Sequence, residues 1–431
     1  MRTIGGCAHP IYLSGRTATR DLITGEVLRF YSTADEPHGT LAVRCGNRRE
    51  SRCEPCSRLH SGDTFHLVRA GLLGGKTVPT AVVRHPRLFV TLTAPSFGAV
   101  HRAGSDASCR PRRSGGQCPH GRPVGCGARH NDSDGAIGQP ICLACYDYAA
   151  HVLWHATAGE LWNRTCILIR RRLAATQSIA QRDLNAHLRL SFAKVAEFQK
   201  RGAVHVHAVI RIDGPDGPHS PPPAWATPRL LTEVVWSAVK AAETHTPYAV
   251  ELGEHAIRWG AEADVRPIFP GASQATVTDS AVAAYIAKYV SKSVGEIGGT
   301  DQRIRNVEEI ESLPVSNHAR ALMGMCWRLG GIPVLAPLRL RLWAHSLGYR
   351  GHVLTKSRKY STTYAALRSA RAEFCSDRGD RGGNASPVTE SSWCYVRSGH
   401  SLAEAEIAAG IAAGLAAARD AAKGERGGGV G

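Results

Sequence analysis

The sequence predicts an α+β fold with strands at the centre, helices between them and one face of the sheet covered. Residues 86–94 alternate as a strand does, and residues 204–212 are rich in β-branched residues. Residues 146–163 and 230–244 repeat apolar residues at helical spacing. A third observation is that cysteines gather in groups with the spacing of metal ligands, which predicts inserted zinc-binding modules.

Other elements follow from the same patterns. Strands are expected at residues 40–44, 165–170, 188–197 and 257–267. The proline-rich residues 214–228 are expected to form an extended surface connection.

The chain is expected to divide into four parts. Residues 1–80 form a basic cysteine-containing module, and residues 81–295 form the sheet domain, with a cysteine-rich insertion at 109–145. Residues 296–370 form a basic accessory region. Residues 371–431 form a flexible tail whose alanine-rich helix, residues 401–423, is read as a peripheral or assembly helix.

The charge balance indicates a polyanionic partner. The 431 residues include 53 Lys and Arg against 36 Asp and Glu, which gives a net charge of +17. Charge alone does not distinguish DNA from RNA. The sequence has no apolar run long enough to cross a membrane, and its first residues lack a signal pattern. A soluble cytoplasmic protein with no membrane partner is therefore expected.

Thirteen cysteines in such a protein favour metal sites over disulfides. Cys45, Cys53 and Cys56 have the spacing C-x7-C-x2-C. A tetrahedral zinc site needs a fourth ligand, for which Cys7 is the first candidate and His60 the reserve.

A second group supplies four thiolates with the spacing C-x7-C-x15-C-x2-C: Cys118, Cys126, Cys142 and Cys145. The surrounding segment is rich in Gly, Pro and Arg and needs a metal to fold. The alternative is that His120 or His130 replaces a cysteine. Two structural zinc ions are thus predicted, and the other cysteines are read as structural or incidental: Cys109, Cys166, Cys326, Cys375 and Cys394.

The string HVH places His205 and His207 on one face of a strand, about 7 Å apart. This spacing suits two ligands of one divalent cation, although such a pair is also common as surface or packed histidine. A hard cation also needs an oxygen ligand. Glu197 on the preceding strand is the candidate, and Gln199 is its competitor.

The segment AVAAYIAKYVSKSV carries Tyr285, Lys288, Tyr289 and Lys292 at spacings that place all four on one helical stripe. One interpretation is an amphipathic helix whose Tyr and Lys side chains reach water. The other is chemical, because cations near a phenol favour the phenolate nucleophile and also bind phosphate.

These motifs resemble the three ordered motifs of the HUH endonuclease superfamily: FVTLTAPSFG, HVH and YIAKYVSK. The chain is more closely similar to the replication initiators of actinomycete rolling-circle plasmids, through CGNRRESRCEPC, CPHGRPVGC, CYDYAAHVLWHATAGELW, VAEFQKRGAVHVHAVIRIDG and WAHSLGYRGHVLTKSRKYSTT. The resemblance implies a ferredoxin-like, RRM-like palm with a central antiparallel sheet in residues 81–295, helices covering one of its faces.

The resemblance also implies a mechanism. His205 and His207 would hold Mg²⁺ or Mn²⁺, and Tyr285 would attack a phosphate of single-stranded or hairpin origin DNA. The products are a 5′-phosphotyrosine and a 3′-OH primer. Lys288 and Lys292 would stabilise the developing charge, and Tyr289 is a candidate second nucleophile. A host helicase and a DNA polymerase are the expected partners.

A basic run within the accessory region 296–370 suits DNA binding: Arg350, Lys356, Arg358 and Lys359, interleaved with Tyr349 and Tyr360. A solvated basic face explains the run almost as well. Two other functions use the same motifs or charges. An HUH transposase or conjugative relaxase shares the chemistry, and a zinc-dependent DNA-binding protein without enzymatic activity would make the histidines and tyrosines coincidental.

Overall fold

The computed structural model describes residues 2–104, 108–110, 116–269, 278–291, 299–376 and 387–427. The chain divides into two compact units, Met1–Thr64 with Thr363–Gly431, and Phe65–Thr362. This division differs from the expected boundaries at 80, 295 and 370. The two ends of the chain form one unit because a strand near the N-terminus pairs with a strand near the C-terminus along its whole length.

The first unit contains a four-stranded sheet that the sequence patterns did not predict beyond residues 40–44. Strand β1 (Ile11–Asp21) lies between β11 (Pro387–Ser398) and β2 (Val27–Ser32), and β3 (Leu41–Val43) also pairs with β1. All these pairings are antiparallel.

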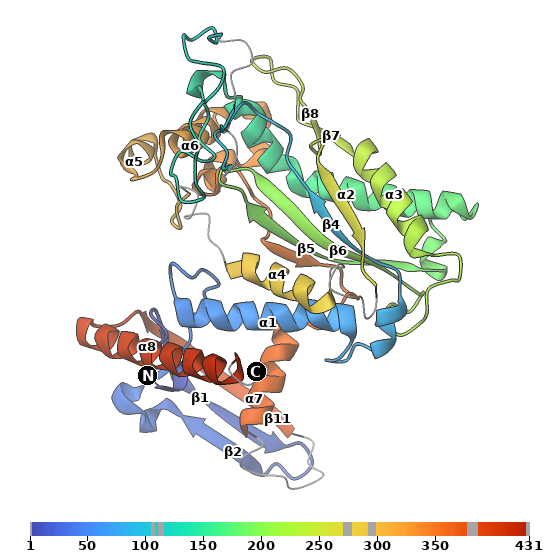
Figure 1. Ribbon diagram of the computed structural model, residues 1–431. Helices are drawn as coiled ribbons and strands as arrows, with labels where there is room; N and C mark the ends of the chain where they lie inside the picture. The colour runs from blue at the N-terminus through green and yellow to red at the C-terminus, as the bar shows by residue number, and fades with distance from the viewer. Residues whose placement is uncertain are drawn as a thin grey trace. The chain divides into compact units, whose positions relative to one another are not determined.

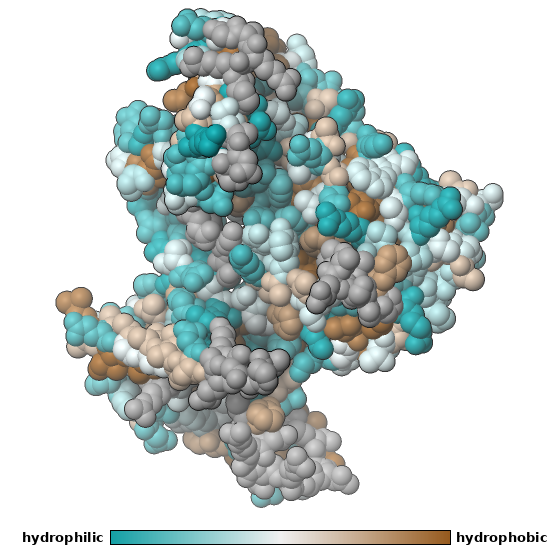
Figure 2. Space-filling model, in the orientation of Figure 1, coloured by the Kyte–Doolittle hydropathy of each residue, from teal (hydrophilic) through white to brown (hydrophobic). Residues whose placement is uncertain are grey.

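Two helices belong to the same unit, α7 (Tyr364–Ser376) and the alanine-rich α8 (Leu402–Gly427). Ala408 of α8 is 1% exposed, and its carbonyl oxygen approaches Gly6 so closely that a Cβ there would lie 2.7 Å away. Gly6 also has a φ of +71°, so both its space and its backbone favour glycine. Apolar residues lie at the surface over α8 in Figure 2. Leu402 and Ile407 are among the exposed apolar side chains of this helix. The predicted helix is confirmed.

The second unit is built on a five-stranded antiparallel sheet in the order β10-β5-β6-β4-β9. Its strands are β4 (Arg87–Leu92), β5 (Arg189–Phe198), β6 (Val204–Asp213), β9 (Ala263–Pro267) and β10 (Leu354–Lys356). The predicted α+β class and the expected central antiparallel sheet agree with this arrangement. The histidine strand β6 lies at the centre (Figure 1).

Two long helices cover one face of this sheet, α2 (Tyr148–Thr176) and α3 (Pro228–Ala241). The side chain of Asp147 caps α2, and Thr227 caps α3 with a proline at its first position. The strand predicted at residues 165–170 is wrong, because this apolar run lies inside α2. A short apolar run shows no clear period in the sequence, so helix and strand were indistinguishable there.

The other face of the sheet carries helix α4 (Asp279–Ser291), so the expectation of helices on one face only is corrected (Figure 1). An apolar stripe of α4 is buried: Val282, Ala283, Ile286, Ala287 and Val290. Arg87 of β4, which is 1% exposed, forms an ion pair with Asp279 in the first turn of α4. This stripe and this ion pair fix the tyrosine-bearing helix over the histidines.

The remaining elements belong to one or the other of the two units. Helix α1 (Glu54–Leu73) ends in the second unit, which also holds α5 (Val307–Ser312) and α6 (Asn317–Leu329). The strand expected at 257–267 is divided into β8 (Ala256–Arg258), which pairs with β7 (Glu243–His245), and β9. Short 3-10 helices lie at Arg2–Ile4, Thr33–Asp35, Pro37–Gly39, Thr80–Arg84, Leu143–Cys145, Leu184–Ala186, Pro333–Leu338 and Leu340–Ser346. Among the described residues, no helix is long and apolar enough to cross a membrane.

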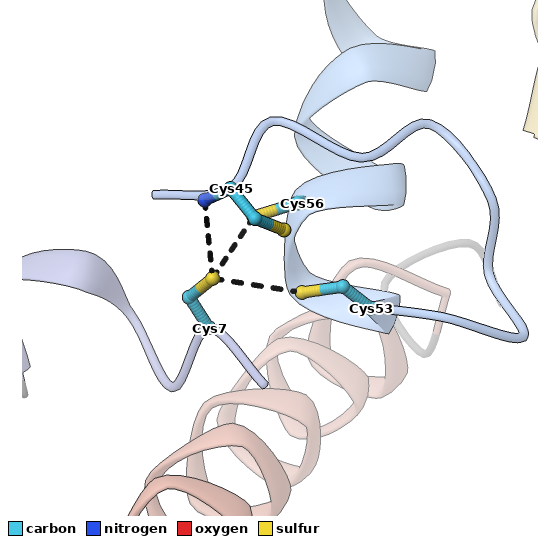
Figure 3. Close-up of side chains that lie close together, drawn as sticks. All are labelled: Cys7, Cys45, Cys53 and Cys56. Carbon is cyan, nitrogen blue, oxygen red and sulfur yellow. Dashed lines mark hydrogen bonds between the residues drawn. The ribbon is translucent and has the colours of Figure 1, made fainter. Parts of the chain in front are cut away.

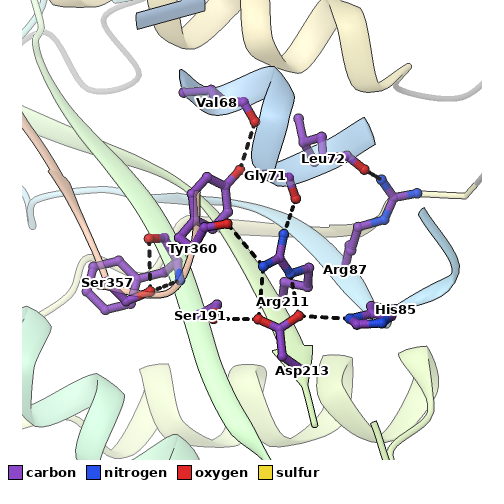
Figure 4. Close-up of polar contacts among 11 residues, drawn as sticks. Val68, Gly71, Leu72, His85, Arg87, Ser191, Arg211, Asp213, Ser357 and Tyr360 are labelled. Atoms are coloured by element: carbon purple, nitrogen blue, oxygen red, sulfur yellow. Dashed lines mark hydrogen bonds and ion pairs between the residues drawn. The ribbon is translucent and has the colours of Figure 1, made fainter. Parts of the chain in front are cut away.

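A buried polar network lies at the end of β6 (Figure 4). Arg211 and Asp213 form a two-point ion pair with distances of 2.6 and 2.9 Å, and neither side chain is exposed. His85 and Ser191 also bond the carboxylate, at 2.8 and 2.6 Å. Burial alone would raise the pKa of Asp213, but the bonds from His85 and Arg211 prevail and lower it. Arg211 also donates to the carbonyl oxygen of Tyr360, which joins the segment after β10 to the sheet.

Candidate active site and metal centres

The two histidines of β6 lie on the face of the sheet that carries α4. Across the ladders, Glu197 of β5 stands opposite His205, and Thr91 of β4 stands opposite His207. The two imidazole centroids are 6.0 Å apart. Because cross-strand neighbours project from the same face, Glu197 joins both histidines on one surface.

His207 is the most connected residue of this surface. Its Nε2 lies 3.0 Å from Oε2 of Glu197 and 3.3 Å from the hydroxyl of Tyr285, and its Nδ1 lies 3.0 Å from Oγ1 of Thr91. Phe89 stacks parallel to its ring at 6.0 Å. Phe89 and Thr91 belong to FVTLTAPSFG, but sequence reasoning did not name them. Phe89 and Thr91 alternate along β4, and this alternation was the sequence signal that could have placed them on one face.

His205 has a free ring nitrogen. Its Nε2 is buried and has no hydrogen-bond partner. Burial, the neighbouring His207 and Arg201 lower the pKa of His205 to about 4, so the imidazole is neutral at pH 7. An unpaired buried lone pair beside a second imidazole and a carboxylate fits a cation, since buried polar atoms otherwise find partners.

The cation site is less closely gathered than the cysteine sites of this protein. Among the described residues, each group of His, Cys, Asp or Glu whose ligand atoms all lie within 4.8 Å of one another contains cysteine. The ligand atoms of His205, His207 and Glu197 are not gathered this closely. These three residues nevertheless supply two nitrogens and an oxygen, a donor set that suits Mn²⁺ or Mg²⁺ together with phosphate oxygens.

The two tyrosines of α4 face the histidines. The Tyr285 and Tyr289 ring centroids are 4.6 Å apart, and the Tyr289 ring lies near parallel to His207 at 5.9 Å. Lys288 is exposed, with Nζ 5.9 Å from the centroid of Tyr289. Lys292 lies outside the described residues, so its expected role is not placed.

The electrostatics of Tyr285 differ from the expectation that nearby cations favour its phenolate. Burial raises the pKa of Tyr285 above its usual range, and a hydrogen bond with Tyr289 and the charge of Glu197 raise it further. The phenol is therefore protonated in the metal-free protein. The sequence spacing placed Lys288 near Tyr285 along the helix, but it did not reveal that the carboxylate of Glu197 also lies near Tyr285.

A cavity of about 360 Å³ opens beside His205. Arg102, Arg110, Arg201 and Gln199 line it. Gln199, the competing third ligand, accepts a hydrogen bond from Nε of Arg201 at 2.9 Å, whereas Glu197 contacts His207 directly. Sequence reasoning missed the three arginines, although Arg201 lies within the EFQKRG string.

The first cysteine group contains the expected residues: Cys7, Cys45, Cys53 and Cys56 (Figure 3). The Sγ of Cys7 lies 3.8 Å from that of Cys53 and 3.6 Å from that of Cys56. Tetrahedral zinc with bonds of about 2.3 Å places sulfurs roughly 3.8 Å apart, so this group fits zinc. His60, the reserve ligand, instead lies against the ring of Tyr364 at 4.8 Å.

The second group differs from the expected set in one ligand. Cys118, Cys142 and Cys145 lie together, and His120 is the fourth member, with its Nδ1 3.2 Å from Sγ of Cys145. The inclusion of Cys126 is corrected. Backbone hydrogen bonds between Arg110 and Cys126 hold that cysteine in a separate group.

That separate group contains Cys126 together with His101, Cys109 and His130. Cys109, which lacks partner spacing in the sequence and was read as structural or incidental, lies in this group. The described residues thus contain three Cys/His groups that could hold metal ions, where two were predicted. His101 and Cys109 have no zinc-like spacing in the sequence, so only the fold reveals them.

The residues of the basic run differ in their surroundings. Lys356 donates to the carbonyl oxygens of Ser357, Arg358 and Ser361, and burial lowers its pKa. Its ammonium therefore stabilises a turn in the segment after β10. Arg350 is exposed and donates to the carbonyl oxygen of Pro337 at 3.0 Å.

The expectation that Tyr349 and Tyr360 take part in DNA binding is corrected, because their side chains are 4% and 0% exposed. They pack inside the unit and are not available to stack on bases. Arg358 and Lys359 line a cavity of about 530 Å³ with Arg170 and Arg189. Basic groups for a polyanion therefore gather there from separate parts of the chain.

The chain belongs to a family of replication initiator proteins. The family model described as "Replication initiator protein, pSAM2" matches residues 1–413. The chain is also 42% identical over 422 residues to a protein of Streptomyces ambofaciens named "Replication initiator protein", a match that covers 95% of this chain and 88% of that one. No solved structure matches the chain. The resemblance to actinomycete initiators is thereby confirmed.

Proposed function

We propose that this protein initiates rolling-circle replication of a plasmid by nicking and joining single-stranded origin DNA. The observation that carries the proposal is the position of the Tyr285 hydroxyl, 3.3 Å from Nε2 of His207. A nucleophile of the correct type thus faces the histidine pair from a separate element. Family membership supports the initiator role.

His205, His207 and Glu197 would hold the divalent cation, Mg²⁺ or Mn²⁺. When bound, such a cation polarises the scissile phosphate and favours the phenolate of Tyr285. Thr91 supports this assignment, because its hydroxyl oxygen accepts a hydrogen bond from Nδ1–H of His207 in the tautomer whose Nε2 carries no proton.

The chemical step is a transesterification. The phenolic oxygen of Tyr285 forms a bond to phosphorus as the bond from phosphorus to the 3′ oxygen breaks, and the DNA 5′ phosphate remains on the tyrosine. The phenolic proton is released, and the leaving oxygen takes up a proton to become the 3′-OH primer. Attack of a 3′-OH on the phosphotyrosine reverses the step and joins DNA.

Neighbouring side chains position the reactants. Phe89 contacts both His207 and Tyr285, with centroids 6.0 and 5.8 Å away, and so holds the two rings at right angles. Exposed Lys288 contacts the DNA phosphates. Tyr289 is the candidate second nucleophile, since it lies against both Tyr285 and His207.

The proposal is tested with purified protein and end-labelled single-stranded DNA from the origin of its own plasmid. With Mg²⁺ or Mn²⁺, a denaturing gel should show a protein-linked fragment and a free 3′-OH fragment. EDTA and His205→Ala should each remove the adduct. Tight DNA binding without any adduct would instead favour a zinc-dependent DNA-binding protein. Cleavage and joining of transposon or transfer-origin DNA, but not of the replication origin, would favour a transposase or relaxase.

A further inference from the structure

We propose that His101, Cys109, Cys126 and His130 bind a third zinc ion, in addition to the two cysteine-rich groups. Nδ1 of His101 lies 3.2 Å from Nε2 of His130 and 3.8 Å from Sγ of Cys109, and Sγ of Cys126 lies 3.5 Å from Nε2 of His130. Tetrahedral zinc places two nitrogens roughly 3.3 Å apart and nitrogen and sulfur roughly 3.5 Å apart. The observed spacing is that of one coordination shell.

Backbone hydrogen bonds bring the ligand residues together. Arg110 and Cys126 exchange two backbone hydrogen bonds of 2.9 and 2.8 Å, and the amide of Cys109 donates to the carbonyl oxygen of Ala128. His101 is joined to the loop in the same way, by hydrogen bonds with Gly138 and Gln139. Paired backbone segments thus place the ligands side by side, and a bound metal would stabilise this arrangement.

A second set of contacts orients the ligand atoms. Oδ2 of Asp134 lies 2.6 Å from Nδ1 of His130, and its Oδ1 accepts from the amide of Ala136. Asp134 thus holds the proton on Nδ1 of His130 and leaves Nε2 as the ligand atom. The amide of Arg102 donates to Sγ of Cys109 at 3.2 Å, which fixes the position of the sulfur. Carboxylate–histidine contacts of this kind accompany zinc sites.

The donor set indicates a structural zinc ion. Two thiolates and two imidazoles complete a tetrahedron, so no position remains for water or substrate. The segment that carries Cys109, Cys126 and His130 is rich in Gly, Pro and Arg, and its described residues are not part of the main apolar core. Such a segment gains its stability from the metal.

The zinc site also positions arginines that line the cavity beside His205, and the role of these arginines rests on the proposed function. Arg102 follows His101, Arg110 follows Cys109, and both arginines line the cavity. Nε of Arg102 donates to the carbonyl oxygen of Cys109 at 2.7 Å, and Nε of Arg110 donates to that of Val100 at 3.0 Å. Zinc thereby fixes two guanidinium groups where the phosphates of a DNA strand would enter.

The zinc content of the full-length protein, purified under reducing conditions, tests the site directly. Elemental analysis should find three zinc ions per chain. X-ray absorption should find on average three sulfur ligands and one nitrogen ligand per zinc, because the three groups contain nine cysteines and three histidines. Two zinc ions per chain would overturn the site, whether sulfur supplies seven of their eight ligands, as in the first two groups, or all eight. This measurement needs no variant.

Variants then identify the ligands. Cys109→Ser should lose one zinc ion, while the matched control Cys394→Ser, which changes an exposed cysteine outside the three groups, should keep all three. Full zinc content in Cys109→Ser would overturn the assignment. Loss of zinc in Cys126→Ser but not in Cys109→Ser would return Cys126 to the second group and also overturn it.

The effect on the cavity has its own test, which does not depend on nicking. Binding of a labelled single-stranded oligonucleotide is measured by anisotropy with zinc retained and without Mg²⁺ or Mn²⁺. Arg102→Ala and Arg110→Ala should each weaken binding about tenfold, the effect of one lost charge-assisted contact. Arg182→Ala, at an exposed arginine outside this cavity, is the control. Unchanged affinity in both cavity variants would overturn the effect on the cavity even if nicking is observed.

Discussion

The hydroxyl of Tyr285 lies 3.3 Å from Nε2 of His207, although the two residues are 78 positions apart in the chain. The strand supplies the histidine and the helix packed on that strand supplies the tyrosine. Asp279 and Arg87 join the first turn of the helix to the neighbouring strand β4. The distance between the proposed nucleophile and the proposed metal ligand is thus set by packing of regular elements, which are more rigid than loops.

Glu197 and Gln199 should differ sharply in their effect on nicking. Glu197→Ala removes the carboxylate that contacts His207, and nicking should fall on the order of a hundredfold or more. Gln199→Ala removes only an acceptor for Arg201 and should have a smaller effect. Single-turnover nicking rates across a Mn²⁺ titration make the comparison. A larger loss in the Gln199 variant would make that residue the third ligand.

The free energy of unfolding should fall as pH decreases from 6.5 towards 4. His151 and His155 are fully buried in α2. Burial and the charges of His155, His318 and Arg201 hold the pKa of His151 well below its usual value, and burial lowers that of His155 to about 4. Because folding favours the neutral rings, the stabilisation is complete above pH 6.5 and is lost as they become protonated.

Thermal unfolding between pH 7.5 and 4.5 measures this loss. His155→Gln retains an acceptor for the amide of Val204 but does not titrate, so its pH dependence should be shallower than that of the wild type. His245→Gln, at a half-exposed histidine, is the control and should follow the wild type. A His155→Gln curve parallel to the wild-type curve would contradict the account.

Asp213→Asn should reduce the free energy of unfolding by about 3–5 kcal/mol. The change leaves the fully buried guanidinium of Arg211 without its counter-charge. Urea unfolding measures the effect. Glu233→Gln breaks the exposed pair with Arg229 and should change the free energy by less than about 1 kcal/mol. Equal effects would show that the buried network contributes no more than a surface pair.

Removal of the first metal site should affect the first unit. Cys53→Ser removes one thiolate from the first cysteine group. In this group, Sγ of Cys7 lies within 4 Å of the sulfurs of both Cys53 and Cys56. One zinc ion should be lost, and limited proteolysis should cleave the N-terminal segment faster than in the wild type. Cys166→Ser, in the core of α2, is the control and should retain all the zinc. Unchanged zinc content in Cys53→Ser would remove this group from the metal sites.

The strand and helix that carry the site were predictable because their residues have clear periods. The alternation through His205 and His207 and the helical spacing of Tyr285 and Tyr289 each lie within one short segment. The contacts that complete the site depend on partners far away in the chain. Thr91 reaches His207 only once β4 pairs with β6, so no local pattern identified it.

Cysteine spacing had the same limit. The first group was predicted in full because three of its members lie within twelve residues, and Cys7 was the nearest unassigned cysteine. Cys126 was assigned to the wrong group, because two cysteines with the spacing C-x7-C can also belong to two separate groups, as Cys118 and Cys126 do. The backbone pairing of Cys126 with Arg110 decides its group, and this pairing leaves no trace in the spacing.

The most direct test of the central claim is identification of the tyrosine that carries DNA after nicking. The protein is incubated with single-stranded origin DNA and Mn²⁺, digested with nuclease and protease, and analysed by mass spectrometry. The account predicts a nucleotide on Tyr285 and no adduct in Tyr285→Phe. A nucleotide on another residue, with Tyr285→Phe nicking at the wild-type rate, would contradict it.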